Sequence, residues 1–156
     1  MWLPAQGALN FGTGFTSPDS ASTFTIPSAA AKAVTVGAYD AGTGSAAPFS
    51  GRGYIVEVGG SLMVKPELAA PGVNVLVPSV SGMARVSGTS YATPFVTGSA
   101  ALLMEWGIVR GNDAFLYGEK LKAYLIKGAE PLAGAAVPDT QTGWGRLCLK
   151  NSLPQA

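Results

Sequence analysis

The stretch SGTSYATPFVTGSAALL, Ser87 to Leu103, decides how this sequence is interpreted. Its small residues fall on several sides of a helix rather than on one, which is typical of a helix buried in a core. Pro94 fits only in the first turn, because amides there have no acceptor within the helix. We therefore expect a buried helix from Thr89 to Trp106 that begins close to Ser90.

Ser90 is the candidate nucleophile. A serine at a helix N-terminus is well placed for acyl transfer, because the free amides and the positive end of the helix dipole stabilise a developing oxyanion. Gly88 allows a tight turn and a close approach to substrate, so Gly88, Thr89 and Ser90 are the expected positioning residues. Composition alone leaves an alternative open, since a serine before a helix is more often an N-cap than a catalyst.

The composition limits the classes of function. Hydrophobic residues make up 47% of the 156 residues and charged residues 12%, so much of the chain expects a protein neighbour. The net charge of +1 favours neither nucleic acid nor anionic lipid as a partner. The longest apolar run, Pro94 to Met104, is shorter than the roughly 20 residues of a membrane span.

Two rare residue types are informative. The sequence contains no histidine, the usual general base for an activated serine, so no Ser-His pair can form within this chain. Cys148 is the single cysteine, which excludes an internal disulfide and fits a small buried hydrophobic residue.

The remaining elements follow from local patterns. Residues 1–28 are expected to be irregular, and Ala33–Tyr39 is expected to be a strand buried on both faces of a parallel sheet. Further strands are expected at Tyr54–Val58 and Val73–Val77, with KPELAAPG, residues 65–72, as a tight turn. A helix is expected over Asp113–Lys127, capped by Asn112 or Asp113 and stopped by Gly128, and a short one over Arg146–Leu153. Strands followed by helices indicate an α/β architecture.

Several polar residues have a structural explanation. Asp40, Asp113 and Asp139 are interpreted as turn or cap residues, and Glu105 with Trp106 as the end of the buried helix. The glycine-rich stretch GTGSAAPFSGRG lacks the Lys-Ser/Thr ending of a phosphate-binding loop, so nucleotide binding is not expected.

The Ser87–Leu103 stretch resembles the nucleophile signature of the subtilase family of serine peptidases. The matching residues are Gly88, Thr89, Ser90, Ala92, Thr93, Pro94, Val96 and Gly98. Phe95 departs from the pattern, since the family usually has a histidine there that is not part of the triad. VTVGAYD (34–40), FSGRG (49–53) and KPELAAPGVNV (65–75) are also similar to family segments, and the C-terminal stretches most resemble a clostridial germination-protease-like branch.

The resemblance implies a C-terminal portion of a subtilisin-like three-layer fold, with a mostly parallel sheet and a buried helix carrying the nucleophile. Residues 1–156 would form a partial catalytic domain, with 1–28 as an irregular edge and 29–156 matching the family. The family's triad runs Asp, His, Ser along the chain, so Asp and His are expected to lie outside this one. Asn10, the one asparagine before the first expected strand, sits in no motif that matches the family's oxyanion asparagine.

Two functions stay open at this point. The chain is either part of a serine endopeptidase acting on peptides or proteins, or a non-catalytic binding or scaffold protein derived from one. No cofactor is expected; the resemblance allows for calcium, without an identified ligand set, and for an extracellular or spore-associated location. The isolated chain is expected to be inactive, and to self-associate or require a complementary N-terminal fragment.

Overall fold

The computed structural model describes residues 8–154. Its central sheet has the order β2-β1-β5, with β1 at Val36–Asp40, β2 at Ser45–Ala46 and β5 at Leu68–Pro71. β1 pairs with β5 in parallel, so that Val36 lies opposite Leu68, and with β2 in antiparallel fashion. The residues from Val36 to Tyr39 are buried, as expected for a strand covered on both faces.

The C-terminal segment extends this sheet. The amide of Ala69 donates to the carbonyl of Gly145, and the amide of Leu147 donates to the carbonyl of Ala69, both at 2.8 Å. The backbone around Arg146 therefore runs parallel to β5 on the side away from β1. β5 thus has a backbone partner on each side.

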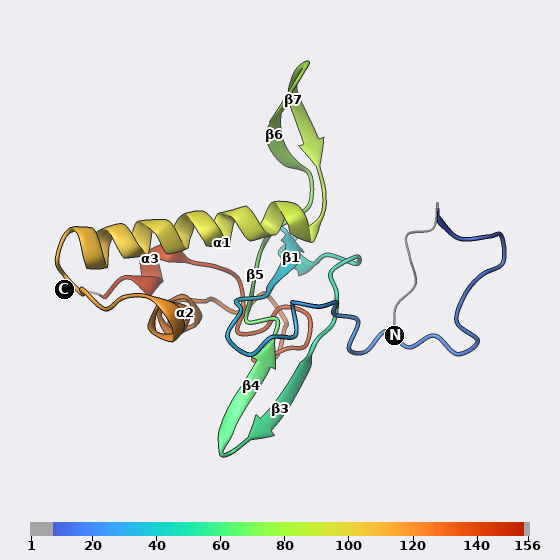
Figure 1. Ribbon diagram of the computed structural model, residues 1–156. Coiled ribbons are helices and arrows are strands. Elements are labelled where there is room, and N and C mark those ends of the chain that lie inside the picture. The colour runs from blue at the N-terminus through green and yellow to red at the C-terminus, as the bar shows by residue number, and fades with distance from the viewer. Residues whose placement is uncertain (1–7, 155–156) are drawn as a thin grey trace.

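The first part of α1 (Thr89–Met104) lies over this sheet, and α2 (Gly118–Lys127) and α3 (Leu149–Ser152) lie beside the rest of α1 (Figure 1). α1 continues as the π-helix η2, Glu105–Val109. α1 packs on β1 and β5, and α2 packs on α1 and α3. The core formed between these elements consists of Val36, Ala38, Ala47, Leu68, Ala70, Ala92, Val96, Leu103, Leu116 and Leu125.

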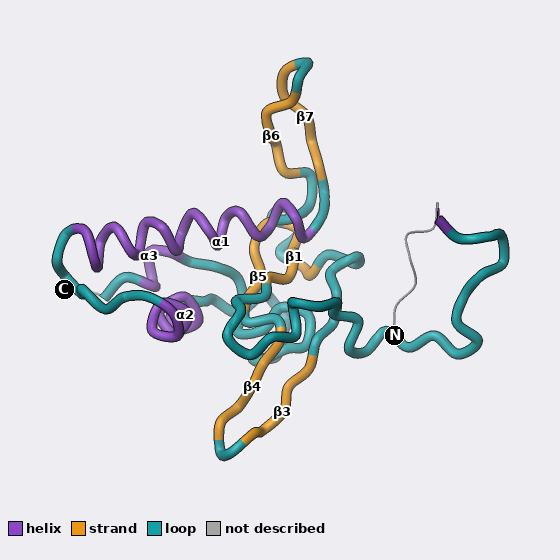
Figure 2. Tube along the Cα trace, viewed as in Figure 1, coloured by secondary structure: helices purple, strands orange, loops and turns teal. Residues whose placement is uncertain are grey.

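Two hairpins project from this body (Figure 2). β3 (Tyr54–Val58) pairs with β4 (Ser61–Lys65), and β6 (Val75–Ser79) pairs with β7 (Gly82–Val86), both in antiparallel fashion. The second hairpin is closed at its base, where the amide of Gly88 donates to the carbonyl of Gly72 at 2.8 Å. The same bond brings the start of α1 to the end of β5.

The α/β architecture is confirmed, and several elements match their predicted positions. β3 has the predicted bounds, Tyr54–Val58, and β1 begins three residues and ends one residue after its predicted limits. Gly128 ends α2 as expected, although its φ of −83° is not left-handed.

The interpretation of residues 65–72 as a turn is wrong, because it missed a strand of the core. The third strand of the core is Leu68–Pro71, inside that stretch. The strand predicted at Val73–Val77 is present two residues later, as the projecting hairpin strand β6, Val75–Ser79. Leu68, Ala69 and Ala70 are completely buried, while Leu76 is half exposed. β-branched residues are common in strands whether or not they are buried, which explains why the sequence indicated the exposed strand β6 more clearly than the buried β5.

The expectation of a fully buried helix also needs correction. α1 buries one face, formed by Ala92, Val96, Ser99 and Leu103, whereas Phe95 is 43% and Leu102 54% exposed. The helical run Thr89–Val109 is long and apolar enough to cross a membrane by length and composition, a test that the core helix of a soluble protein also passes.

The second and third helices begin later than predicted. α2 starts at Gly118 with Tyr117 as N-cap, so neither Asn112 nor Asp113 caps it. The residues before α2 instead bury Leu116 against Gly107. A Cβ atom added to Gly107 would lie only 2.8 Å from the Leu116 side chain. α3 is confined to Leu149–Ser152 because the residues before it pair with β5.

Candidate active site

Ser90 is the second residue of α1, and its side chain is exposed. The N-cap is Gly88, with φ 154° and ψ 156°, so the interpretation of Ser90 as a capping residue is wrong. The amide of Tyr91 donates to the carbonyl of Gly88 at 3.1 Å and closes the first turn. The Ser90 hydroxyl is therefore available to another molecule at the positive end of a 16-residue helix.

Ser90 borders an open cleft of about 290 Å³. One wall comes from the first turn of α1 and the other from the irregular segment that leads into β1. The lining residues are Pro27, Ser28, Ala33, Val34, Thr35, Val36, Thr89, Ser90 and Thr93. The cleft is thus walled by small, apolar and hydroxyl side chains.

The residues that line the cleft do not include Asn10. Asn10 lies in an exposed N-terminal segment that runs away from the body of the molecule (Figure 1), where its carbonyl accepts a bond from the amide of Thr13 at 3.1 Å. The chain joins the body at Thr23, whose amide donates to the carbonyl of Arg52 at 2.7 Å. The expectation that Asn10 has no catalytic position stays a prediction.

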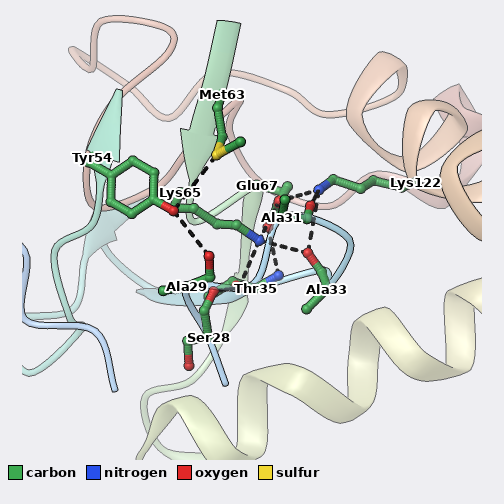
Figure 3. Close-up of polar contacts among 10 residues, drawn as sticks. All are labelled: Ser28, Ala29, Ala31, Ala33, Thr35, Tyr54, Met63, Lys65, Glu67 and Lys122. Atoms are coloured by element: carbon green, nitrogen blue, oxygen red, sulfur yellow. Dashed lines mark hydrogen bonds and ion pairs between the residues drawn. The ribbon is translucent and has the colours of Figure 1, made fainter. Parts of the chain in front are cut away.

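A buried charge cluster lies behind the cleft wall, and no pattern in the sequence predicted it (Figure 3). The Lys65 ammonium lies 2.7 Å from Oε1 of Glu67, and Lys122 from α2 forms an ion pair with the same oxygen. The side chains of Lys65 and Glu67 are 0% and 2% exposed. A lysine and a glutamate on either side of Pro66 in an otherwise apolar stretch were the available signal.

Burial of these charges carries a desolvation cost. Burial lowers the pKa of Lys65, and the hydrogen bond to Glu67 opposes that shift. Removal of water from both ions is offset only when each is fully paired. Here Oε2 of Glu67 also accepts a 2.7 Å bond from the amide of Thr35, so both carboxylate oxygens have partners.

The other acidic residues have structural roles. Oδ1 of Asp40 accepts from the amide of Gly42 at 2.8 Å, and Oδ1 of Asp139 accepts from the amide of Gln141 at 2.7 Å, which confirms both as turn residues. Asp113 binds Lys120, and this hydrogen bond is the main reason that the pKa of Asp113 lies below its usual value.

The predicted end of the long helix also takes a structural role. Glu105 pairs with Arg110 at 2.8 Å across η2, and Trp106 packs against the core. Cys148 is half-buried and free. Among residues 8–154 no group of three or more His, Cys, Asp or Glu side chains is arranged to hold a metal ion.

Comparison with protein families identifies this arrangement. The model described as "Subtilase family" matches residues 9–145, which include the Ser90 motif, both sides of the cleft and β5. The chain belongs to the subtilase family. Its sequence is that of a subtilase-family serine protease domain.

Solved subtilases share the fold. The CspB protease of Clostridium perfringens superposes with a TM-score of 0.79 and 44% identity over 90% of this chain and 30% of that one, which confirms the resemblance to a clostridial branch. The self-cleaved protease domain of PatA has a TM-score of 0.62 and 30% identity over 81% of this chain and 42% of that one.

Relatives identified by sequence similarity are also named as proteases. The minor extracellular protease Vpr of Bacillus subtilis is 27% identical over 121 residues, 69% of this chain and 13% of Vpr. The PII-type proteinase of Lactococcus lactis is 38% identical over 67 residues, 42% of this chain and 4% of that proteinase. This chain therefore spans less than half the length of each of these relatives.

Proposed function

We propose that this chain supplies the nucleophile of a subtilase endopeptidase, and that Ser90 is that nucleophile. The observation that carries the proposal is the exposed Ser90 hydroxyl at the second position of α1, beside an open cleft. Gly88 and Thr89 position it at the head of the helix. The alternative, a non-catalytic scaffold derived from the family, lacks a comparable specific observation in its favour.

The reaction would follow the acyl-enzyme route. The Ser90 oxygen attacks a peptide carbonyl carbon, and its proton passes to a general base. The C–N bond breaks, the amine leaves with that proton, and an ester joins Ser90 to the acyl group. Water then hydrolyses the ester and restores the serine. Amides at the start of α1 are suited to stabilise the oxyanion formed in both steps.

The isolated chain is proposed to be inactive, because it contains no histidine to act as the base. In subtilisin, loss of the catalytic histidine lowers kcat by about a factor of 10⁶. The aspartate and histidine of the triad are proposed to come from a segment outside this chain. That segment would also cover the exposed face of α1, where Phe95 and Leu102 contact solvent.

The test is fluorophosphonate labelling of Ser90 in two preparations. One is the 156-residue chain alone; the other is the chain co-expressed with the part of the C. perfringens CspB protease N-terminal to the shared region. We expect negligible labelling of the chain alone and rapid labelling of the complex. Ser90→Ala should abolish labelling in the complex, whereas Ser87→Ala, just outside the helix, should not.

Two results would overturn the proposal. Labelling of the complex that persists in Ser90→Ala places the nucleophile elsewhere. A complex that forms with the expected stoichiometry and still does not label at Ser90 favours the scaffold function.

A further inference from the structure

The irregular segment from Ser28 to Thr35 has two sides with different neighbours. Ser28, Ala33 and Thr35 line the cleft at Ser90. On the other side, backbone groups of the same segment meet the buried ions Lys65, Glu67 and Lys122 (Figure 3). One short piece of chain therefore joins the cleft to the charge cluster.

The contacts between segment and cluster are numerous for its length. Lys122 donates to the carbonyl of Ala31 at 2.8 Å, and Lys65 donates to the carbonyl of Ala33 at 2.7 Å. Glu67 accepts from the amide of Thr35 through its side chain and donates to the carbonyl of Thr35 through its own amide, at 2.7 and 3.0 Å. Each ion of the cluster thus binds the segment directly.

Apolar burial anchors this segment only at its end, where Val34 packs against the core. Residues 29–33 read AAAKA, and Ala29, Ala30, Ala31 and Lys32 are all exposed. An alanine side chain buries too little area to anchor a loop. The described contacts that hold residues 29–33 are therefore polar ones, to the Tyr54 hydroxyl at Ala29 and to the cluster at Ala31 and Ala33.

Charge balance explains why the segment and the cluster depend on each other. Two ammonium groups share one carboxylate, which leaves one positive charge in excess at a largely buried site. The carbonyl oxygens of Ala31 and Ala33 carry partial negative charge and face these ammonium groups. The wall thus completes the coordination of the cations, and the cations hold the wall.

We propose that Lys65, Glu67 and Lys122 are positioning residues that fix the Ser28–Thr35 wall of the cleft opposite Ser90 and thereby set how tightly a peptide substrate is held. This inference rests on the proposed role of Ser90 in peptide hydrolysis. The residues act through the backbone of the wall and do not touch the reacting atoms.

Lys122→Met is the variant that tests this inference, because Lys122 is the most exposed of the three residues, at 18%, and its removal leaves the Lys65–Glu67 pair intact. Lys122→Arg retains the charge and the donors. Lys120→Met is the matched control, since Lys120 lies on the same helix and loses an ion pair with Asp113, away from the wall.

The first measurement is hydrogen exchange of residues 28–36 in the chain alone. We expect exchange in Lys122→Met to accelerate about tenfold, as for the loss of one charge-assisted hydrogen bond, with Lys122→Arg restoring protection.

The second measurement is peptide hydrolysis by the complex with the CspB segment. We expect KM to rise about tenfold and kcat to change less than about twofold, with recovery in Lys122→Arg and no effect of Lys120→Met.

The two measurements distinguish failure of the proposed function from failure of this inference. If the wild-type complex is inactive, the proposed function fails, and the exchange data alone decide whether the cluster holds the wall. Unchanged exchange at 28–36 in Lys122→Met overturns the inference, as does equal acceleration in Lys120→Met. Accelerated exchange with unchanged KM in an active complex overturns the link to substrate binding.

Discussion

Gly72 lies so close to Ala38 that a Cβ atom on Gly72 would be 2.6 Å from the Ala38 methyl carbon. This contact brings the end of β5 against β1, and the carbonyl of Gly72 accepts the bond from Gly88 that places the start of α1. The position of Ser90 at the start of α1 therefore depends on residue 72 having no side chain.

Gly72→Ala should destabilise the chain. The added methyl would meet Ala38 and lie 3.4 Å from the Cβ of Ala92, so we expect a loss of about 1–3 kcal/mol in the free energy of unfolding. Urea denaturation of the soluble chain measures it. Gly98→Ala is the control, because nothing lies within 4 Å of that position in α1 and alanine favours a helix interior by about 0.5–1 kcal/mol. A neutral Gly72→Ala would contradict the prediction.

Gly143→Ala should cost more. Gly143 has φ +62°, and a Cβ atom there would clash with the backbone carbonyls of Pro66 and Glu67. We expect a loss of about 2–5 kcal/mol, the sum of the left-handed penalty and the clash. Gly134→Ala has a similar φ of +74° with open space around it, so it should lose only about 1–2 kcal/mol. Equal losses in the two variants would show that the close contact of Gly143 with Pro66 and Glu67 contributes nothing.

Glu67→Gln should be strongly destabilising, because it leaves two ammonium groups without a carboxylate. Removal of one partner of a buried ion pair costs about 3–5 kcal/mol, and we expect a loss in this range from chemical denaturation. Glu119→Gln removes the same charge from an exposed position in the first turn of α2 and should cost about 1 kcal/mol or less. A Glu67→Gln protein as stable as the control would mean that the cluster is not tightly coupled.

Acid should weaken the fold through two surface ion pairs. Lys120 lowers the pKa of Asp113, and Arg146 lowers the pKa of Glu130. The folded chain therefore binds these protons less readily than the unfolded chain, and the stability that the pairs add above about pH 5 is lost as the pH falls through the lowered values. Asp113→Asn should flatten the fall of the urea midpoint between neutral and acidic pH. A slope identical to that of the wild type would contradict this assignment.

The exposed side of α1 should make the isolated chain self-associate. Phe95 and Leu102 lie on this side, and Leu102→Lys should reduce the average mass measured by light scattering after gel filtration. Leu103→Lys, at the neighbouring buried position, should unfold the chain instead. A wild-type chain that is monomeric at every concentration tested would refute the prediction.

Local sequence predicted the features that depend on neighbouring residues. The start of α1 followed from Pro94 and from the small residues after it, and β1 followed from its unbroken apolar run. β5 was missed because LAAP carries no β-branched residue, and its strand conformation depends on partners on both sides that are distant in sequence.

The candidate site shows the same limit. Ser90 was recognisable from its own motif, whereas the ion pair of Lys122 with Glu67 joins α2 to the strand region at β5, two segments far apart in the sequence. Charge and spacing along the chain do not show such a pairing. The exposed side of α1 was likewise hidden, since a helix with small residues all round gives no indication of which side remains uncovered.

At the base of the β6–β7 hairpin the amide of Gly88 donates to the carbonyl of Gly72. This bond fixes the start of α1, which carries Ser90, independently of the outer part of the hairpin. Val80 lies at the tip of this hairpin and is fully exposed. Insertions or deletions near Val80 would therefore leave the start of α1 in the same position. The hairpin tip is therefore a natural place to attach an epitope or a fluorescent label.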